Sequence, residues 1–405
     1  MDFTPATRQH ALEMIEEFAP RMGRRYASGR NYDHGPGRHK AVSQLSPHIR
    51  RRLVTEEEVT AAAVEHHGLD GAEKFVQEVF WRGYFKGWLE RRPEVWTSYR
   101  DGLASDLAAI ESDRRLRKRV DIAESGATGL ECFDAWVAEL VDTGYLHNHA
   151  RMWFASIWIF TLGLPWRTGA DFFHRHLLDG DSASNTLGWR WVAGLHTRGK
   201  IYEAKAWNIA KFTSQRFTPR DSDFASDAVS LDASEPSGLP PTLPVREIQA
   251  PDLTLPTALL ITEEDLHLEA FRPSEFDIRA SATLAASHLR SERTVADHVK
   301  SFEAEALADA AGRLGLTAQS MTAGSPKDLV AWAKRAGVQQ IATAYFPQGP
   351  LHDWLKRAKP ELSRAGIALC EWRRDWDTAI WRHATAGFFK VKQQIPKILN
   401  ELECV

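Results

Sequence analysis

The residues from Thr143 to Thr197 include most of the side chains that could do chemistry in this sequence. Asp179 and Asp181 are separated by a single glycine, and Arg151 lies upstream at the start of a strongly apolar segment. A charged guanidinium on an apolar helix needs an opposite charge, because burying it unpaired is costly. The pattern therefore predicts an ion pair between Arg151 and one of the two aspartates. Taken alone, such a pair would more often be structural than functional.

Aromatic and amide side chains accompany these charges. Trp189 and Trp191 follow the aspartates, Trp166 precedes them, and Asn148 and Asn185 contribute amides. Indole rings usually pack in cores, but they can also stack on planar ligands. The combination of ion pair, amides and indoles favours a ligand-binding site over a purely structural ion pair.

A second group of candidates lies upstream, where Glu78 and Trp81 are three residues apart and therefore share a helix face. Glu78 alone would be interpreted as a solvated helix residue, but its spacing to Trp81 favours a functional role. An earlier helix opens with a hydroxyl cap and an acidic first turn at 55–58. The helix that carries Glu78 and Trp81 follows it and ends before Pro93.

The predicted secondary structure changes along the chain, from helices to a linker and then to alternating strands and helices. Residues 8–217 show helical periodicity almost throughout, and 147–162 is apolar nearly all round, which predicts an interior helix. Proline recurs between 234 and 256, which indicates a linker. Beyond it, short apolar runs alternate with helical segments, which predicts a parallel sheet covered on both faces. We expect strands near 258–261, 284, 318–322, 340–345 and 367–371, and helices at 301–314, 326–336 and 350–365.

Composition limits the function classes. The chain has 405 residues and a net charge of -3, so no global field attracts nucleic acid. Its three cysteines are far apart, which fits a reducing compartment and excludes a four-cysteine cluster. Neither a signal peptide nor a bilayer-spanning segment is recognisable. We expect a cytoplasmic protein without a membrane partner. The histidine pairs 147/149 and 174/176 do not share a helix face, so we predict no metal site.

Six ordered motifs in residues 24–217 resemble the photolyase/cryptochrome family. They are VSQLSP at 42–47 after a tyrosine, FVQEVFWR at 75–82, Thr128-Gly129 with Asp134, HNHARM at 147–152, WRTGADFF at 166–173 and DGDSASNTLGWRW at 179–191.

The resemblance implies that the cofactor is FAD and assigns residues to it. The diphosphate and ribityl chain would be held by Tyr32, Ser43, Leu45, Ser46 and Arg82. Asn148, Arg151 with Asp179, Asp181 and Asn185 would lie near the flavin ring, with Asn185 closest to its N5 atom.

The resemblance also implies a catalytic pocket and an electron relay. Residues matching those that contact a cyclobutane pyrimidine dimer in repair enzymes of the family are Glu78, Trp81, Asn148, Met152 and Trp191. Indoles suit this task, since a flipped-out lesion presents flat faces. Trp189 and Trp166 match the proximal and middle electron-transfer tryptophans.

Two readings of function follow. The first is light-driven, flavin-dependent repair of pyrimidine dimers in damaged DNA, with single-stranded DNA left open as the preferred form. The alternative is a blue-light sensor of the cryptochrome kind without repair activity. His149 stands where repairing relatives usually have arginine, and the distal tryptophan is missing near Asp113, with Trp153 or Trp158 as substitutes. These departures favour the sensor.

The fold class expected is a multidomain α plus α/β protein, monomeric. An all-helical, photolyase-type FAD-binding catalytic domain at 1–220 would be followed by a proline-rich linker at 221–256. A Rossmann-like α/β domain would then occupy 257–405. Relatives carry their α/β domain first, so the order implies a circular permutation. In the family this domain often holds an antenna chromophore, whose identity here is open.

Overall fold

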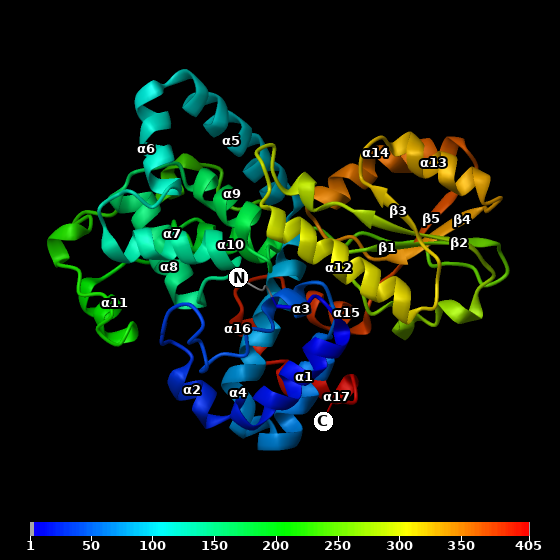
Figure 1. Cartoon of the computed structure of the whole chain (residues 1–405), viewed down its shortest axis with the longest axis horizontal. Coiled ribbons are helices and arrows are strands. Elements are labelled where there is room, and N and C mark those ends of the chain that lie inside the picture. The colour runs from blue at the N-terminus through cyan, green and yellow to red at the C-terminus, as the bar shows by residue number, and fades with distance from the viewer. Residues whose placement is uncertain (1–3, 405) are drawn as a thin grey trace. The chain divides into compact units, whose positions relative to one another are not determined.

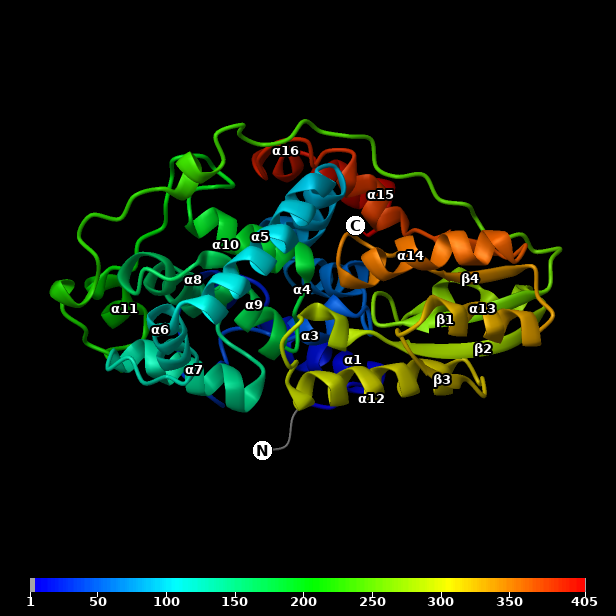
Figure 2. The same cartoon turned by 90° about the horizontal axis from the view of Figure 1, so that it is seen from above.

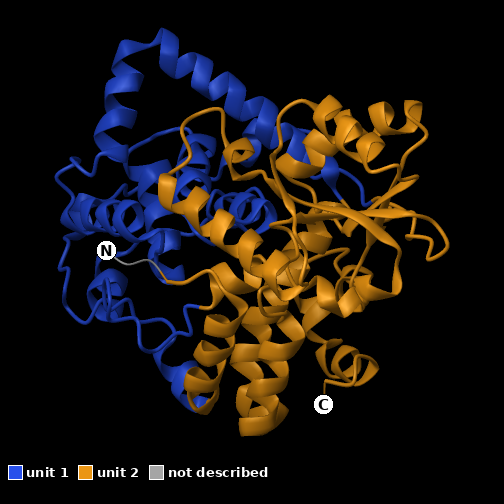
Figure 3. Cartoon of the chain, turned by 45° about the vertical axis from the view of Figure 1, so that its right-hand side comes forward, with its two compact units in different colours: residues 1–3, 24–44, 92–242 blue, residues 4–23, 45–91, 243–405 orange. Residues whose placement is uncertain are grey.

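The computed structural model describes residues 4–404, and the contacts within it divide the chain into two compact units (Figure 3). Among the residues described, unit 1 comprises 24–44 and 92–242. Unit 2 comprises 4–23, 45–91 and 243–404. Each unit is described by itself below. No helix in the described part of the chain combines the length and apolar composition needed to cross a bilayer.

Unit 1 is helical (Figure 1). Its helices are α2 (Arg24–Gly29), α5 (Pro93–Ser112), α6 (Arg114–Glu124), α7 (Glu131–Thr143), α8 (Asn148–Ser156), α9 (Trp166–His176), α10 (Ser182–Val192) and α11 (Ala206–Phe212).

Helix α8 lies in the interior of unit 1, as its apolar sequence predicts. It continues as a π-helix, η2 (Ile157–Thr161), and Trp153, Phe154 and Trp158 on this segment are fully buried. The preceding helix α7 ends at Gly144, whose φ of 65° is left-handed and suits a residue without a Cβ. Residues 147–162 therefore form the central helix that carries several candidate site residues.

The helical part of unit 2 is dominated by α4 (Glu56–Glu90). Its other helices are α1 (Arg8–Phe18), α3 (Ser46–Arg50), α15 (Asp375–Trp381), α16 (Phe389–Lys392) and α17 (Ile395–Glu401). The Thr55 hydroxyl and the Glu58 carboxylate form a reciprocal capping box at the start of α4. Gly68 interrupts α4 with non-helical backbone, and the part that follows carries Glu78, Trp81 and Arg82.

Two glycines let α15 approach α4 closely. A Cβ on Gly83 would lie 2.9 Å from Ile380, and one on Gly87 would lie 2.5 Å from the Trp381 ring and 2.9 Å from its Cα. At both positions this packing leaves little room for a larger side chain.

The remainder of unit 2 is a five-stranded sheet in which every pairing is parallel. Its strands are β1 (Thr257–Thr262), β2 (Ile278–Ala285), β3 (Gln319–Thr322), β4 (Gln340–Ala344) and β5 (Ala368–Trp372), in the spatial order β3-β2-β1-β4-β5.

Helices cover both faces of this sheet. The helices α13 (Pro326–Arg335) and α14 (Pro350–Arg364) lie on one side and α12 (Asp297–Arg313) on the other (Figure 1). In β1, Ala258 and Leu260 belong to the core under α13 and α14, and Leu259 and Ile261 are fully buried on the opposite face. The α + α/β fold class, the parallel sheet and the positions of its elements are confirmed.

The contact-based units differ from the sequential division 1–220, 221–256 and 257–405. The predicted helical domain is divided, since α1, α3 and α4 belong with the sheet in unit 2. Sequence periodicity shows that a helix has an apolar face but not which partner covers it. The predicted linker contains the short 3-10 helices η3 (Asp221–Asp223) and η4 (Leu231–Ser234). From 235 to 256 it has neither helix nor strand (Figure 2).

Candidate functional site

The predicted ion pair is present in unit 1 between Arg151 and Asp179. The Arg151 guanidinium donates to the Asp179 carboxylate at 2.9 Å, and its Nε donates to the carbonyl of Leu146 at 2.8 Å. The Asp179 side chain is 5% exposed and that of Arg151 is 23% exposed. Asp179 rather than Asp181 is therefore the partner of Arg151.

Asp181 instead caps the helix that carries the second amide. Its carboxylate accepts a hydrogen bond of 2.8 Å from the backbone N–H of Ser184 at the start of α10. One turn along, the Asn185 side-chain amide donates to the carbonyl of Ala170 at 2.7 Å. This hydrogen bond fixes the orientation of the amide group. A residue that hydrogen-bonds a planar ligand needs such a fixed orientation.

Three residues of the predicted lesion pocket lie in unit 1. Asn148 and Met152 are on the first turns of α8, where Asn148 is exposed and Met152 is half-buried. Trp191 lies near the end of α10 and its ring contacts that of Tyr202, with centroids 5.5 Å apart.

His149, which stands where an arginine was expected, is held inside unit 1. Its ring stacks on Trp153 with centroids 4.1 Å apart, and its nitrogens contact the Asn31 carbonyl and the Tyr202 hydroxyl at 3.0 and 3.1 Å. Burial lowers its pKa, although the hydrogen bond to the Asn31 carbonyl opposes this. His149 is thus a positioned, largely neutral group rather than a cation directed at a phosphate.

The predicted relay tryptophans are both buried, in different ring environments. Trp189 makes edge contacts with Phe154, Phe173 and Trp158, and the Trp158 centroid is 6.4 Å away. Trp166 contacts Tyr99 at 5.7 Å. The structure therefore places Trp158 in direct contact with the proximal tryptophan.

Residues expected near the diphosphate fall on both sides of a backbone turn. Tyr32 packs its ring edge against Phe212, with centroids 5.2 Å apart. Gln44 between Ser43 and Leu45 has a left-handed φ of 55°, and Ser46 begins α3. This conformation reverses the chain immediately before a helix N-terminus, a geometry that suits anionic ligands.

The remaining predicted residues lie on α4 in unit 2. Arg82 is half-buried, and its Nη1 is buried without a protein hydrogen-bond partner. Trp81 stacks on Phe388 with centroids 4.0 Å apart and an interplanar angle of 16°. Glu78 is half-buried one turn before Trp81.

The structure therefore groups the sixteen predicted residues into two sets. Unit 1 contains Tyr32, Ser43, Asn148, Arg151, Met152, Trp166, Asp179, Asp181, Asn185, Trp189 and Trp191, and unit 2 contains Leu45, Ser46, Glu78, Trp81 and Arg82.

Sequence reasoning missed one buried polar cluster in unit 1. Asp33, His39 and Glu139 bring potential metal ligands within 4.8 Å of one another. Asp33 also accepts hydrogen bonds from Arg216 at 2.5 Å and from Trp136 at 2.9 Å. That guanidinium neutralises Asp33 and repels a further cation, so the cluster resembles an internal ion network more than a metal centre. No short motif links the three positions, so the sequence carried no signal for them.

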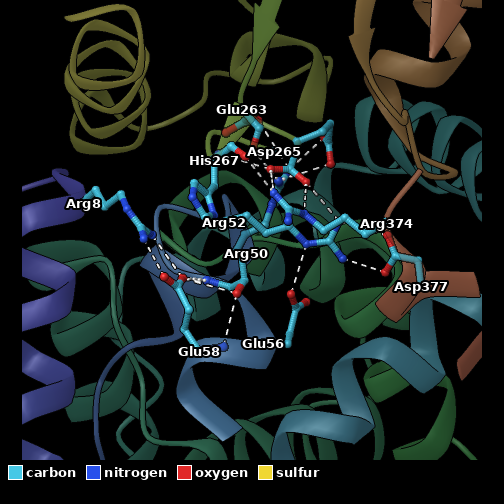
Figure 4. A network of polar contacts seen from close by, with 12 residues as sticks. Arg8, Arg50, Arg52, Glu56, Glu58, Glu263, Asp265, His267, Arg374 and Asp377 are labelled. Carbon is cyan, nitrogen blue, oxygen red and sulfur yellow. Dashed lines mark hydrogen bonds and ion pairs between the residues drawn. The ribbon is translucent and has the colours of Figure 1, made fainter. Parts of the chain in front are cut away.

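A larger ionic network occupies the carboxyl edge of the sheet in unit 2 (Figure 4). Arg51 and Arg52 reach the segment after β1, with ion pairs to Glu263 at 3.0 Å and to Asp265 at 3.3 Å. Arg374 pairs with Asp265 at 2.6 Å. Burial alone would raise the pKa of Asp265, but Arg374 and Arg52 hold it at about 2.

At the same edge, the loop that follows β4 forms hydrogen bonds with a buried side chain of α4. Glu90 on α4 accepts hydrogen bonds from the Tyr345 hydroxyl at 2.7 Å and from the Gln348 N–H at 2.6 Å. Burial raises the pKa of Glu90, and the Tyr345 and Gln348 hydrogen bonds oppose this. The neighbouring ends of β1 and β4, where α/β sheets usually bind ligands, are thus filled by buried side chains.

Comparison with known proteins gives one matching family. Residues 75–222 match the sequence model of the FAD binding domain of DNA photolyase. Over 161 residues the chain is 38% identical to a deoxyribodipyrimidine photo-lyase of Streptomyces griseus, covering 39% of this chain and 33% of that protein. It is 34% identical over 175 residues to a chloroplastic/mitochondrial cryptochrome DASH of Ostreococcus tauri, covering 43% of this chain and 29% of the relative.

A solved bacterial class III photolyase from Agrobacterium tumefaciens matches 51% of this chain and 43% of its own, with 26% identity and a TM-score of 0.41. The chain spans less than half of the length of these relatives.

Proposed function

We propose that this chain is a light-driven lyase that splits cyclobutane pyrimidine dimers in damaged DNA, because residues 75–222 match the FAD binding domain of DNA photolyase. The observation that carries the proposal is the arrangement in unit 1. An ion pair, Arg151 with Asp179, and an oriented amide, Asn185, accompany the exposed Asn148 and the Trp191 ring.

The residues present fit FAD. Arg82 has a buried guanidinium nitrogen without a protein partner, as expected of a group that binds a phosphate oxygen of the cofactor. Ser43, Leu45 and Ser46 supply hydroxyls and backbone amides beside the turn at Gln44 that precedes α3, and Tyr32 supplies a further hydroxyl. A bound, reduced flavin would supply the light-driven electron-transfer chemistry that ring opening requires.

The chain's own residues would bind and orient the dimer. Trp191 and Trp81 each offer a flat apolar surface on which a pyrimidine can stack, and Asn148 offers an amide for a base edge. Glu78 would hydrogen-bond the edge of a base. Met152 would line the apolar wall beside Asn148.

A sensor of the cryptochrome kind is the second candidate. The observation that favours it is the stack of Phe388 on Trp81, which covers one face of an indole that a lesion would need. Repair then requires that the dimer use the other face of Trp81 or displace Phe388.

An antenna chromophore does not fit at the edge formed by the ends of β1 and β4. Arg51, Arg52 and Glu90 fill it with buried ion pairs and hydrogen bonds that a chromophore would have to break. We therefore propose FAD as the light-absorbing group. We further propose that the protein acts as a monomer in the cytoplasm, in keeping with three free thiols.

The test is light-dependent repair of an oligonucleotide with one thymine dimer by the reduced, FAD-loaded protein. Glu78→Ala should lower the single-turnover repair rate by roughly tenfold to a hundredfold, since a hydrogen bond to a charged group contributes about 1.5–3 kcal/mol. Glu73→Ala is the matched control, because Glu73 lies on the same helix with its side chain 50% exposed.

Dimers that stay intact under illumination, with FAD bound and photoreducible, would reject the lyase and leave the sensor. Equal repair by the Glu78 variant and the wild type would reject the role assigned to Glu78.

A further inference from the structure

The segment from Arg198 to Arg220 in unit 1 is strongly basic within an acidic chain. It contains six arginines and lysines and one carboxylate, Glu203, whereas the whole chain has a net charge of -3. A local basic stretch of this kind matters for polyanion binding even when the global charge does not.

Helix α11 in the middle of this segment has two distinct faces. Its inner face carries the buried Ala206 and Ile209, and the Asn208 side chain accepts a hydrogen bond of 2.9 Å from the indole of Trp153. Its outer face carries Trp207, which is 63% exposed, and Lys211 one turn later. The inner contacts fix the helix, so the exposed indole is held on a rigid base.

The three arginines make local contacts, Arg220 with its side chain 82% exposed, and Lys211 Nζ lies over the Phe212 ring, 5.0 Å from its centroid. Arg198 donates to the carbonyls of Asp232 and Glu235, Arg216 pairs with Asp33, and Arg220 pairs with Asp223. The exposed lysines are Lys200, Lys205 and Lys211.

Among these lysines, Lys205 forms an ion pair of 2.9 Å with Glu203, with side chains 53% and 33% exposed. Exposed pairs of this kind contribute little and exchange readily. The lysines therefore leave positive charge available around Trp207.

The segment that carries this surface contacts residues of the predicted lesion pocket in unit 1. Tyr202, five residues before Trp207, contacts the Trp191 ring and the His149 imidazole. Trp153, which holds Asn208, lies on the same helix as Asn148 and Met152. The helix is thus anchored to the elements that carry three pocket residues.

A single exposed aromatic residue needs no explanation, because most proteins have some. An exposed indole with exposed lysines nearby in the sequence is different, since this combination binds unpaired nucleic-acid strands. Bases of any sequence stack on the ring, and lysines neutralise the phosphates on either side. The positive charge on this surface also makes an apolar protein partner a poorer fit than a nucleic-acid strand.

We propose that the exposed surface of the segment 200–211, formed by Trp207 and Lys211 on α11 with Lys200 and Lys205 before it, is a second DNA contact outside the lesion pocket. An unpaired base of the strand that flanks the dimer stacks on Trp207, and the lysines bind the adjoining phosphates. This surface supplies the phosphate grip that His149 cannot supply. The inference rests on the proposed function, because it places the strand next to that pocket.

The experiment measures binding of a fluorescently labelled, undamaged oligodeoxythymidine by anisotropy, over a range of salt concentrations. Trp207→Ala should weaken single-strand binding by roughly fivefold to a hundredfold, as the loss of one base–aromatic stack predicts. Lys211→Ala should weaken it and reduce the salt slope by about 0.7. Phe389→Ala is the matched control, because Phe389 is 67% exposed and lies in unit 2.

The same variants are then tested on a dimer-containing strand, first for binding and then for repair at saturating protein. We expect weaker binding by the Trp207 variant with an unchanged repair rate once the strand is bound. A thermal unfolding temperature equal to that of the wild type would show that the variant is folded.

Unchanged affinity in the Trp207 variant, or an unchanged salt slope in the Lys211 variant, would overturn the inference, whatever the repair assay shows. An equal loss of affinity for fully paired duplex would overturn the stacking of an unpaired base. If single-strand binding depends on Trp207 but dimers are never split, the inference stands and the lyase proposal fails.

Discussion

Individual residues in unit 1 show how the site is held in place. Arg151 and Asp179 satisfy each other's charge, and the Asn185 amide is fixed by the Ala170 carbonyl. His147 caps α8, because its Nδ1 accepts a hydrogen bond of 3.2 Å from the His149 N–H. That acceptor exists only while the imidazole is neutral.

Burial lowers the pKa of His147 to about 3, and the nearby Asp33 carboxylate opposes this only in part. In the unfolded chain the same histidine is protonated below about pH 6.5. Unfolding therefore takes up a proton between pH 6.5 and 3, so the stability contributed by neutral His147 is present above pH 6.5. It is lost as the pH falls through that range.

We predict that His147→Asn, which keeps an acceptor for the cap but does not titrate, makes stability less dependent on pH. Between pH 7 and pH 5 the thermal unfolding temperature of the wild type should fall by several degrees more than that of the variant. His66→Asn, at an exposed histidine, should follow the wild type. Identical pH profiles for all three proteins would show that His147 does not cause the acid sensitivity.

At the level of elements, the contact between α4 and α15 links the start of the chain to its end within unit 2. Phe80 and Trp376 have ring centroids 4.8 Å apart, and Gly83 and Gly87 leave room for Ile380 and Trp381. Because α4 also carries Glu78, Trp81 and Arg82, this packing fixes the helix that holds three of the predicted site residues.

Gly87→Ala should destabilise the protein by about 1–3 kcal/mol, because the new methyl group meets the backbone and ring of Trp381. A control glycine with open space is Gly312 on α12, where alanine should be neutral or stabilising by up to about 1 kcal/mol. Chemical denaturation of the two variants provides the comparison. A Gly87 variant as stable as the Gly312 variant would contradict the close packing.

At the level of the whole molecule, unit 2 is discontinuous in sequence. It gathers 4–23, 45–91 and the residues from 243 onward around one sheet and one long helix. The buried network of Arg52, Asp265 and Asp377 joins 45–91 to the residues from 243 onward through contacts of 2.6 to 3.3 Å. Removing one of these charges would unbalance a buried ionic network, which is destabilising.

This arrangement predicts that the chain cannot be cut into its sequential domains. A fragment of residues 1–256 would leave Phe80 and Tyr84 on α4 without Trp376 and Phe388. We expect rapid hydrogen exchange of the α4 amides in that fragment, with protection restored when residues 257–405 are added. Full protection of α4 in the fragment alone would show that the helical segment folds independently.

Signals within short stretches of sequence predicted the elements and part of the site. The capping residues at Thr55 and Glu58, the apolar periodicity of α8 and the strand runs of the sheet are local, so each depends only on its neighbours. The Arg151–Asp179 pair was predictable because an apolar helix requires a counter-charge. Ordered motifs made the cofactor recognisable.

The tertiary structure alone decided which surfaces meet. The stack of Phe388 on Trp81, the Asp33–His39–Glu139 cluster and the arginines at the carboxyl edge of the sheet each join residues about 100 or more positions apart. The division of the predicted site residues between two units is of the same kind. An apolar or charged face shows that a partner is required but not which one, because many arrangements bury the same area and pair the same charges.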